Sequence, residues 1–274
     1  MLDRILMSYK WNLLLHSQGI YLSWFYSLRI YIIGNFLADF LPTGVTGDLY
    51  RIFRVSSRVG SKAKVTASVL IERAIGLIAI ATLALFSMLL MVIWKDGFML
   101  EWVGLVFLFL VAGLSGFFFS ICLQPRKWVS RFLPRYKEAR IFQKLFELHD
   151  AYAQYRGQNK VLLIFFCLSA LEQFLLVVRV YLSVMALNIT IDPVYIFGIS
   201  PICHLLAFAS FVIRAIGITE GLYWFFFSKV GVSVTQVLAF AILLRVVGLL
   251  VVIAGGVFYL LESLKLRKEV KLPG

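Results

Sequence analysis

Charged side chains lie inside or beside long apolar stretches of this sequence, where charge is costly. They are Arg29, Asp39, Asp48, Glu72, Arg73, Glu172, Arg179, Arg214, Glu220 and Arg245. Each would cost about 2.5–3.5 kcal/mol or more if it faced lipid at the middle of a bilayer. We therefore expect these groups to face one another or a wet interior. They are either ion-paired struts between helices or a polar path for an anionic substrate, and both interpretations stay open.

Two arginines are the best candidates for holding an anionic group. Arg73 and Arg245 occupy matching positions in two similar segments, RAIGL and RVVGL. A guanidinium can bind a phosphate through two parallel hydrogen bonds. Neighbouring carboxylates would balance this charge or bind a cationic headgroup. The other charged residues assigned to this binding site are Asp48, Arg51, Glu72, Glu172, Arg179 and Glu220.

Three short segments recur in the same order along the chain. GVTGDLY (44–50) resembles GITEGLY (217–223), SSRVG (56–60) resembles FSKVG (227–231), and RAIGL (73–77) resembles RVVGL (245–249). Because the spacing between copies hardly changes, we interpret them as a duplicated unit.

Helix-breaking residues interrupt both copies of this unit. They are Pro42, Gly44, Gly47, Gly217 and Gly221. Thr46 and Thr219 are candidate N-caps of short helices that begin after the breaks. A helix N-terminus at membrane depth would favour an anionic group. The alternative is that GVTGD and GITEG are simple turns.

Membrane-spanning helices are the elements that would position these residues. Hydrophobic residues make up 61% of the 274 residues, and the mean hydropathy is +0.91. Soluble domains are usually about 45–50% apolar, and a span needs about 20 residues. The apolar stretches are 19–41, 65–93, 98–123, 161–187, 194–213, 219–228 and 236–261. We predict an all-α, polytopic transmembrane helix bundle.

The distribution of Lys and Arg predicts how the chain crosses the membrane. Basic residues concentrate at the N-terminus, in 51–64, in 124–160 and in the tail, and they are few near 94–97 and 188–193. The positive-inside rule puts the basic segments, including the C-terminus, in the cytoplasm of a prokaryotic cell. Residues 19–58 and 194–230 must then form broken, re-entrant hairpins of opposite orientation. Inverted repeats with broken helices are typical of many secondary transporters.

The whole chain, 1–274, is predicted to form a single transmembrane domain. Repeat 1 covers about 19–123 and repeat 2 about 161–262, with an amphipathic cytoplasmic connector at 124–160 and a basic tail at 263–274. Nucleotide-binding and hydrolase motifs are absent from the sequence, and its His and Cys residues are scattered. We expect no metal, no cofactor, no nucleic-acid partner and no enzymatic activity.

The order of the motifs resembles the lysylphosphatidylglycerol synthase transmembrane family, also called the flippase-like domain. The resemblance rests on GNFLADFLPTGVTGDLYRIFRVSSRVG (34–60), on SVLIERAIGL (68–77) and on GITEG (217–221), and it covers roughly 10–262. It implies a membrane domain that moves lipids or lipid-linked molecules between leaflets. Members that transfer lysine add a cytosolic aminoacyl-transferase domain, which this sequence lacks. Members also usually carry one or two more spans before the segment that begins here at Trp11.

The resemblance favours a translocator of an anionic phospholipid or a polyprenyl-phosphate-linked substrate. In that case Arg73 and Arg245 would hold the phosphate while the tails stay in the bilayer. The alternative is an accessory membrane partner of a lipid-linked glycosyl- or acyltransferase. A third hypothesis, an intramembrane enzyme acting on a lipid phosphate, would need an ordered carboxylate cluster for Mg²⁺, and no such motif is present.

Overall fold

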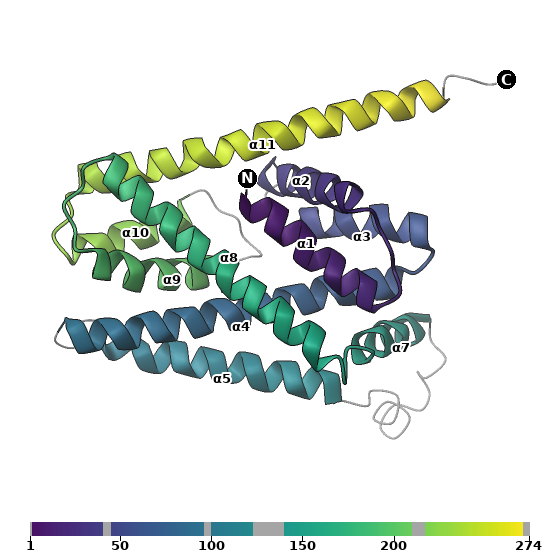
Figure 1. The fold of residues 1–274 in the computed structure, drawn as a ribbon, viewed down its shortest axis with the longest axis horizontal. Coiled ribbons are helices and arrows are strands. Elements are labelled where there is room, and N and C mark those ends of the chain that lie inside the picture. The colour runs from purple at the N-terminus through teal and green to yellow at the C-terminus, as the bar shows by residue number, and fades with distance from the viewer. Residues whose placement is uncertain (1, 41–44, 96–99, 123–139, 210–216, 271–274) are drawn as a thin grey trace.

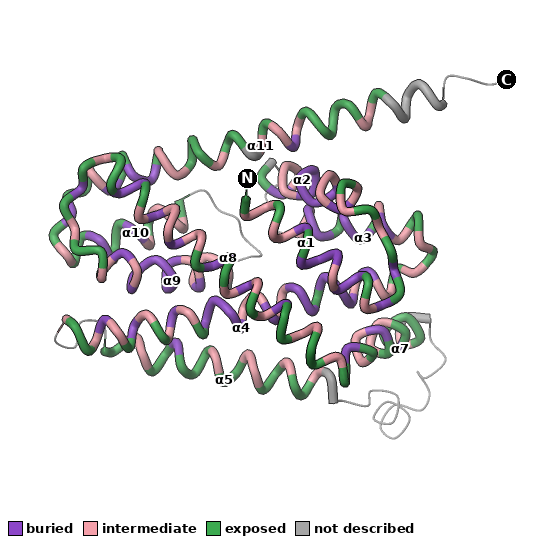
Figure 2. Tube along the Cα trace, in the orientation of Figure 1, coloured by how far each residue is buried: buried purple, intermediate pink, exposed green. Residues whose placement is uncertain are grey.

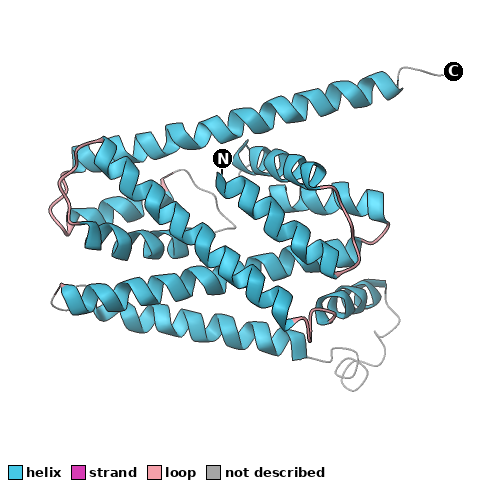
Figure 3. Cartoon of the chain, viewed as in Figure 1, coloured by secondary structure: helices cyan, strands magenta, loops and turns pink. Residues whose placement is uncertain are grey.

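The computed structural model describes residues 2–40, 45–95, 100–122, 140–209 and 217–270. Across these residues the protein is all-helical and contains no strand (Figure 3). The helices are α1 (Leu2–Ser17), α2 (Trp24–Phe40), α3 (Thr46–Val59), α4 (Lys62–Trp94), α5 (Leu100–Cys122), α7 (Arg140–Ala153), α8 (Asn159–Ala186), α9 (Pro193–Ala209), α10 (Ile218–Ser228) and α11 (Val234–Val270).

Four of these helices are long and apolar enough to cross a membrane. They are α4, α5, α8 and α11, and they match the predicted stretches 65–93, 98–123, 161–187 and 236–261. Their outward faces carry apolar side chains, as the exposed residues of α5 and α11 show (Figure 2). Apolar side chains that are exposed on a spanning helix contact lipid rather than water. The all-α bundle predicted from the sequence is confirmed.

The remaining apolar stretches form two pairs of shorter helices. Helix α2 lies within the predicted stretch 19–41, and α3 begins before the basic segment that follows it. Helices α9 and α10 correspond to the predicted stretches 194–213 and 219–228. Figure 1 shows that the α2–α3 pair opens toward the end of the bundle that holds α7, whereas α9–α10 opens toward the opposite end. The two hairpins therefore enter from opposite ends. Their inversion relative to the membrane stays a prediction, because it requires the two membrane sides to be assigned.

The two halves of the chain pack against each other reciprocally. Helix α4 lies along α9, α11 lies along α2, and α4 and α11 run in opposite directions (Figure 1). Glycines permit these close approaches. A Cβ on Gly255 of α11 would lie 2.6 Å from the Phe36 Cβ of α2, and a Cβ on Gly198 of α9 would overlap Met91 of α4. Small residues at such contacts allow helix backbones to approach closely.

Two helices outside the predicted spans also pack against the bundle, and the sequence predicted only one of them. The predicted amphipathic connector does contain a helix, α7, which packs on α4 and buries Phe146 and Ala151. Helix α1, in contrast, was not predicted as part of the bundle. It packs on α2 and α8, and its Trp11 and Leu15 are fully buried. The basic N-terminal segment is therefore part of the interior.

Candidate functional site

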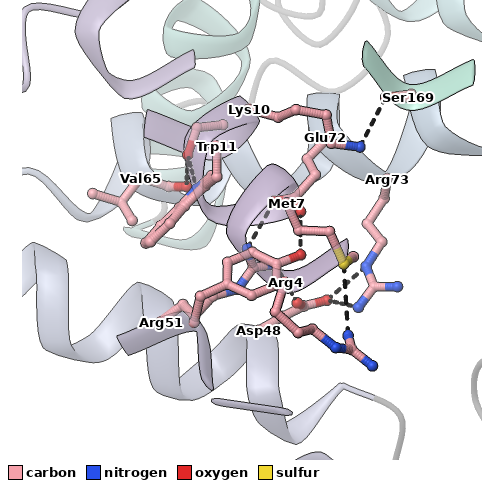
Figure 4. A network of polar contacts seen from close by, with 12 residues as sticks. Arg4, Met7, Lys10, Trp11, Asp48, Arg51, Val65, Glu72, Arg73 and Ser169 are labelled. Carbon is pink, nitrogen blue, oxygen red and sulfur yellow. Dashed lines mark hydrogen bonds and ion pairs between the residues drawn. The ribbon is translucent and has the colours of Figure 1, made fainter. Parts of the chain in front are cut away.

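Four charged side chains from α3 and α4 form one network, in which Asp48, Arg51 and Glu72 are buried and Arg73 is partly exposed (Figure 4). Asp48 and Arg51 are three residues apart and so share one face of α3, and Arg51 Nη2 donates to Asp48 Oδ1 at 2.6 Å. On α4, Glu72 Oε2 accepts from Arg51 Nη1 at 2.8 Å, and Arg73 Nε donates to Asp48 Oδ2 at 2.9 Å. The two acidic and two basic groups neutralise one another, as charges away from water require.

Aromatic side chains enclose the centre of this network. The Tyr31 hydroxyl of α2 donates to Glu72 Oε1 at 2.7 Å. The Arg51 guanidinium carbon lies 4.3 Å from the centre of the Tyr31 ring and 4.9 Å from that of Trp11. Trp11 is itself held by a hydrogen bond from its Nε1 to Ser68 Oγ, at 3.1 Å. A guanidinium stacked on aromatic faces gains cation–π energy as well as its ion pairs.

A second buried ion pair joins α1 to α8. Lys10 Nζ contacts Glu172 Oε2 and also donates to Ser169 Oγ at 3.0 Å. The ammonium lies 5.0 Å from the centre of the Phe165 ring. Both members of the pair are buried, so the contact fixes α1 against a helix that can span the membrane.

The second half of the chain repeats one ion pair of the first. Arg245 Nε of α11 donates to Glu220 Oε1 of α10 at 2.9 Å, and the two residues are 25 apart, the same separation as Asp48 and Arg73. Glu220 Oε2 also accepts from the Gly217 N–H at 3.1 Å. The surroundings differ, however, because the Arg245 side chain is 46% exposed and the Arg51 side chain only 4%.

Arg179 stands apart from the other candidate arginines. It is half-buried on α8, and its Nε is buried without a hydrogen-bond partner. Its charged neighbours are Asp3 and Arg4, because α1 and α8 pack in opposite directions. Those two residues contact each other at 3.5 Å, so Asp3 is already engaged. Arg179 is thus a cation inside a candidate span that has no carboxylate in direct contact within the described part of the chain.

Comparison with known proteins gives one match. The family described as "Lysylphosphatidylglycerol synthase TM region" matches residues 1–256. The chain belongs to this family. No curated protein and no solved structure matches the chain.

The lysylphosphatidylglycerol synthase TM region of this chain contains all the contacts described above. The resemblance inferred from the motifs at 34–60, 68–77 and 217–221 is therefore confirmed, and the chain is a membrane protein of this family. Among the described residues no group of three His, Cys, Asp or Glu side chains is arranged to hold a metal ion. The ion pairs described above are formed by guanidinium, ammonium and carboxylate groups.

Several predicted positions differ from those in the structure. Glu172 and Arg179 share a face of α8, but the partner of Glu172 is Lys10. The N-caps of α3 and α10 are Val45 and Gly217, so Thr46 and Thr219 are helical residues and the capping prediction was wrong. Arg51 was placed in a cytoplasmic basic segment but is buried. Three predicted residues lie outside the described part of the chain: Pro42, Gly44 and Arg214.

The predicted glycine breaks behave differently in the two halves. A Cβ on Gly47 would lie 2.5 Å from the Gly34 carbonyl oxygen, so Gly47 lets α3 approach α2. Gly217 has a φ of +108°, a backbone conformation that glycine adopts without strain. A Cβ on Gly221 would meet nothing within 4 Å, and the same holds for Gly76, three residues after Arg73.

The sequence did not identify Lys10, Trp11 and Tyr31 as members of the site. Lys10 and Trp11 lie in a segment whose charges predicted exposure, and Tyr31 is one of many aromatic residues in apolar stretches. A usable signal was present in α1. Trp11, Leu14 and Leu15 follow a helical spacing that predicts one buried face.

Proposed function

We propose that this chain translocates an anionic phospholipid, or another lipid carrying a phosphate headgroup, between the leaflets of a prokaryotic cell membrane. The C-terminus would lie in the cytoplasm. The headgroup would cross along the polar interior while its tails stay in the bilayer. No covalent step is required, and we propose that the chain is not an enzyme. The substrate class includes polyprenyl-phosphate-linked molecules, since the headgroup chemistry is the same.

The observation that carries the proposal is that Arg179 lacks a direct carboxylate contact. Arg51, Arg73 and Arg245 each contact a carboxylate, whereas Arg179 has no such contact among the described residues. An isolated cation in a spanning helix is costly unless an anionic group or water accompanies it. A phosphate passing through the interior would supply that charge and could accept two guanidinium hydrogen bonds.

The ion-paired network of α3 and α4 would then support the helices rather than bind the headgroup, with the exception of Arg73. Arg73 is held by Asp48 but keeps 33% of its side chain exposed. No side chain fills the space beside Gly76. Arg73 could therefore contact a headgroup while it stays paired with Asp48. We propose Arg73 as a secondary phosphate ligand. Arg51 is enclosed on all sides and has no such freedom.

The test is translocation of headgroup-labelled phosphatidylglycerol in proteoliposomes. We compare the natural protein with Arg179→Gln, and use Arg156→Gln, in the exposed turn before α8, as the matched control. Losing a charged hydrogen bond costs about 1.5–3 kcal/mol, so Arg179→Gln should slow translocation at least tenfold while Arg156→Gln leaves it unchanged.

Two outcomes contradict this account separately. If the natural protein moves lipid no faster than protein-free vesicles, the translocator proposal fails and the accessory-partner alternative becomes the better one. If the natural protein works and Arg179→Gln matches it, the assignment of Arg179 fails while translocation stands.

A further inference from the structure

An apolar groove lies between α4, α8 and α9. Its volume is about 440 Å³. Helix α4 contributes residues from Leu83 to Trp94, α8 contributes Phe174 and Val177, and α9 contributes residues from Pro193 to Pro201. No charged side chain lines it, and Ser87 supplies its one lining hydroxyl. Water inside would find almost no hydrogen-bond partners, so a wet groove is unfavourable.

The length of the groove matches one leaflet of a bilayer. Leu83, Ser87, Leu90 and Trp94 recur at intervals of three or four residues and so follow one face of α4. With a rise of 1.5 Å per residue, they extend over about 16 Å. Half the hydrocarbon core of a typical bilayer is about 15 Å thick. The groove therefore has the length of a single leaflet rather than of the whole membrane.

The ends of the groove fit this position in the membrane. At one end Trp94, 63% exposed, is the last residue of α4. Tryptophan is enriched where the hydrocarbon meets the headgroups. The next residue, Lys95, contacts Asp192, whose pKa is lowered by that hydrogen bond. The Asp192 carboxylate is therefore charged at neutral pH, and its pair with Lys95 lies where headgroups would be.

The groove is open toward the surroundings of the bundle. Phe86 and Phe174 line it and are 59% and 46% exposed. They belong to α4 and α8, which are both candidate spans. In a membrane protein the medium beside such residues is lipid hydrocarbon, which is the occupant that this lining fits.

We propose that this groove is a binding site for one acyl chain of a membrane phospholipid from the leaflet at the Trp94 end. The chain lies along α4 between α8 and α9, with its headgroup near Lys95 and Asp192. This is a resident lipid site, separate from the path along Arg179. It requires only binding, so it holds whether or not the protein moves lipids.

The experiment uses phosphatidylglycerol carrying a photoactivatable diazirine in one acyl chain, in phosphatidylethanolamine vesicles containing the full chain. After illumination, crosslinked peptides are mapped by mass spectrometry. Ser87→Phe and Val194→Phe fill the groove from two different helices. Thr82→Phe is the matched control, because Thr82 is exposed on α4 and does not line the groove. Circular dichroism checks that each variant is folded.

We expect crosslinks to concentrate on peptides containing Phe86–Trp94 and Phe174–Val177. Their yield should fall at least fivefold in both groove-filling variants and stay unchanged in Thr82→Phe. The proposal is overturned if the yield on these peptides equals that on the outward face of α5. It is also overturned if groove-filling variants keep the natural yield.

Discussion

Replacing Arg51 with methionine tests whether the network at α3 and α4 is a buried set of charges. The Arg51 guanidinium contacts Asp48 at 2.6 Å and Glu72 at 2.8 Å, and its side chain is 4% exposed. Methionine keeps much of the length and apolar character of arginine but removes the charge. Among the described residues, Glu72 would keep the Tyr31 hydroxyl as its one partner, and Asp48 would keep Arg73.

The expected loss of stability follows from this burial. Removing one partner of a buried ion pair typically costs about 3–5 kcal/mol, because the remaining charge is uncompensated. Arg51 also loses contact with two aromatic rings, which adds to the cost. We expect Arg51→Met to destabilise the protein by about 4 kcal/mol. The exposed pair Lys95–Asp192 provides a comparison, since surface ion pairs contribute little to stability.

The assay is unfolding in mixed micelles, with helicity followed by circular dichroism as sodium dodecyl sulfate is added. The free energy of unfolding of Arg51→Met is compared with that of Lys95→Gln. A double variant, Arg51→Met with Glu72→Gln, should recover part of the loss, because the amide removes the orphaned charge. The reasoning is refuted if Arg51→Met lies within about 1 kcal/mol of Lys95→Gln, which is the scale of a surface pair.

Two further predictions use the same assay. Lys10→Met should cost about 3–5 kcal/mol because Glu172 would be left buried and unpaired, and adding Glu172→Leu should restore most of the stability; a double variant as unstable as the single one would contradict this. Gly47→Ala should destabilise the α2–α3 hairpin, because its Cβ would lie 2.5 Å from the Gly34 oxygen. Gly221→Ala should be neutral or should stabilise the protein by up to about 1 kcal/mol, because a Cβ there enters open space on α10. Equal effects of the two alanines would show that the close approach does not matter.

Hydrophobicity alone predicted the spanning helices well. The stretch 65–93 became α4 at Lys62–Trp94, and 161–187 became α8 at Asn159–Ala186. A long apolar run has few alternatives in lipid, since only a helix satisfies all its backbone groups within one segment. Helix α1 was missed for the opposite reason. Its buried Lys10 makes the segment look polar, and the partner that allows this burial lies 162 residues away.

The sequence predicted that charges within apolar stretches are satisfied, but it did not predict which residues pair. The sequence indicated that the charges within apolar stretches must be satisfied, and the network of Asp48, Glu72 and Arg73 agrees with this. Spacing along one helix places Glu172 and Arg179 on the same face, but it did not identify Lys10 as the partner of Glu172. Spacing describes faces of a single helix, whereas the choice of partner depends on how different helices pack. The repeated separation of 25 residues between acid and arginine was visible only after the contacts were known.

The unequal anchoring of the two hairpins has a consequence for motion. In the first half, α3 is held to α4 by buried ion pairs under aromatic rings; in the second half, α10 is held to α11 by the partly exposed Glu220–Arg245 pair and by apolar packing that includes Tyr223 and Phe240. Apolar contacts are non-directional, whereas hydrogen-bonded ion pairs fix one geometry. The two copies of the duplicated unit are therefore anchored by different kinds of contact. We expect small shifts of α10 against α11 to disturb fewer directional contacts than shifts of α3 against α4.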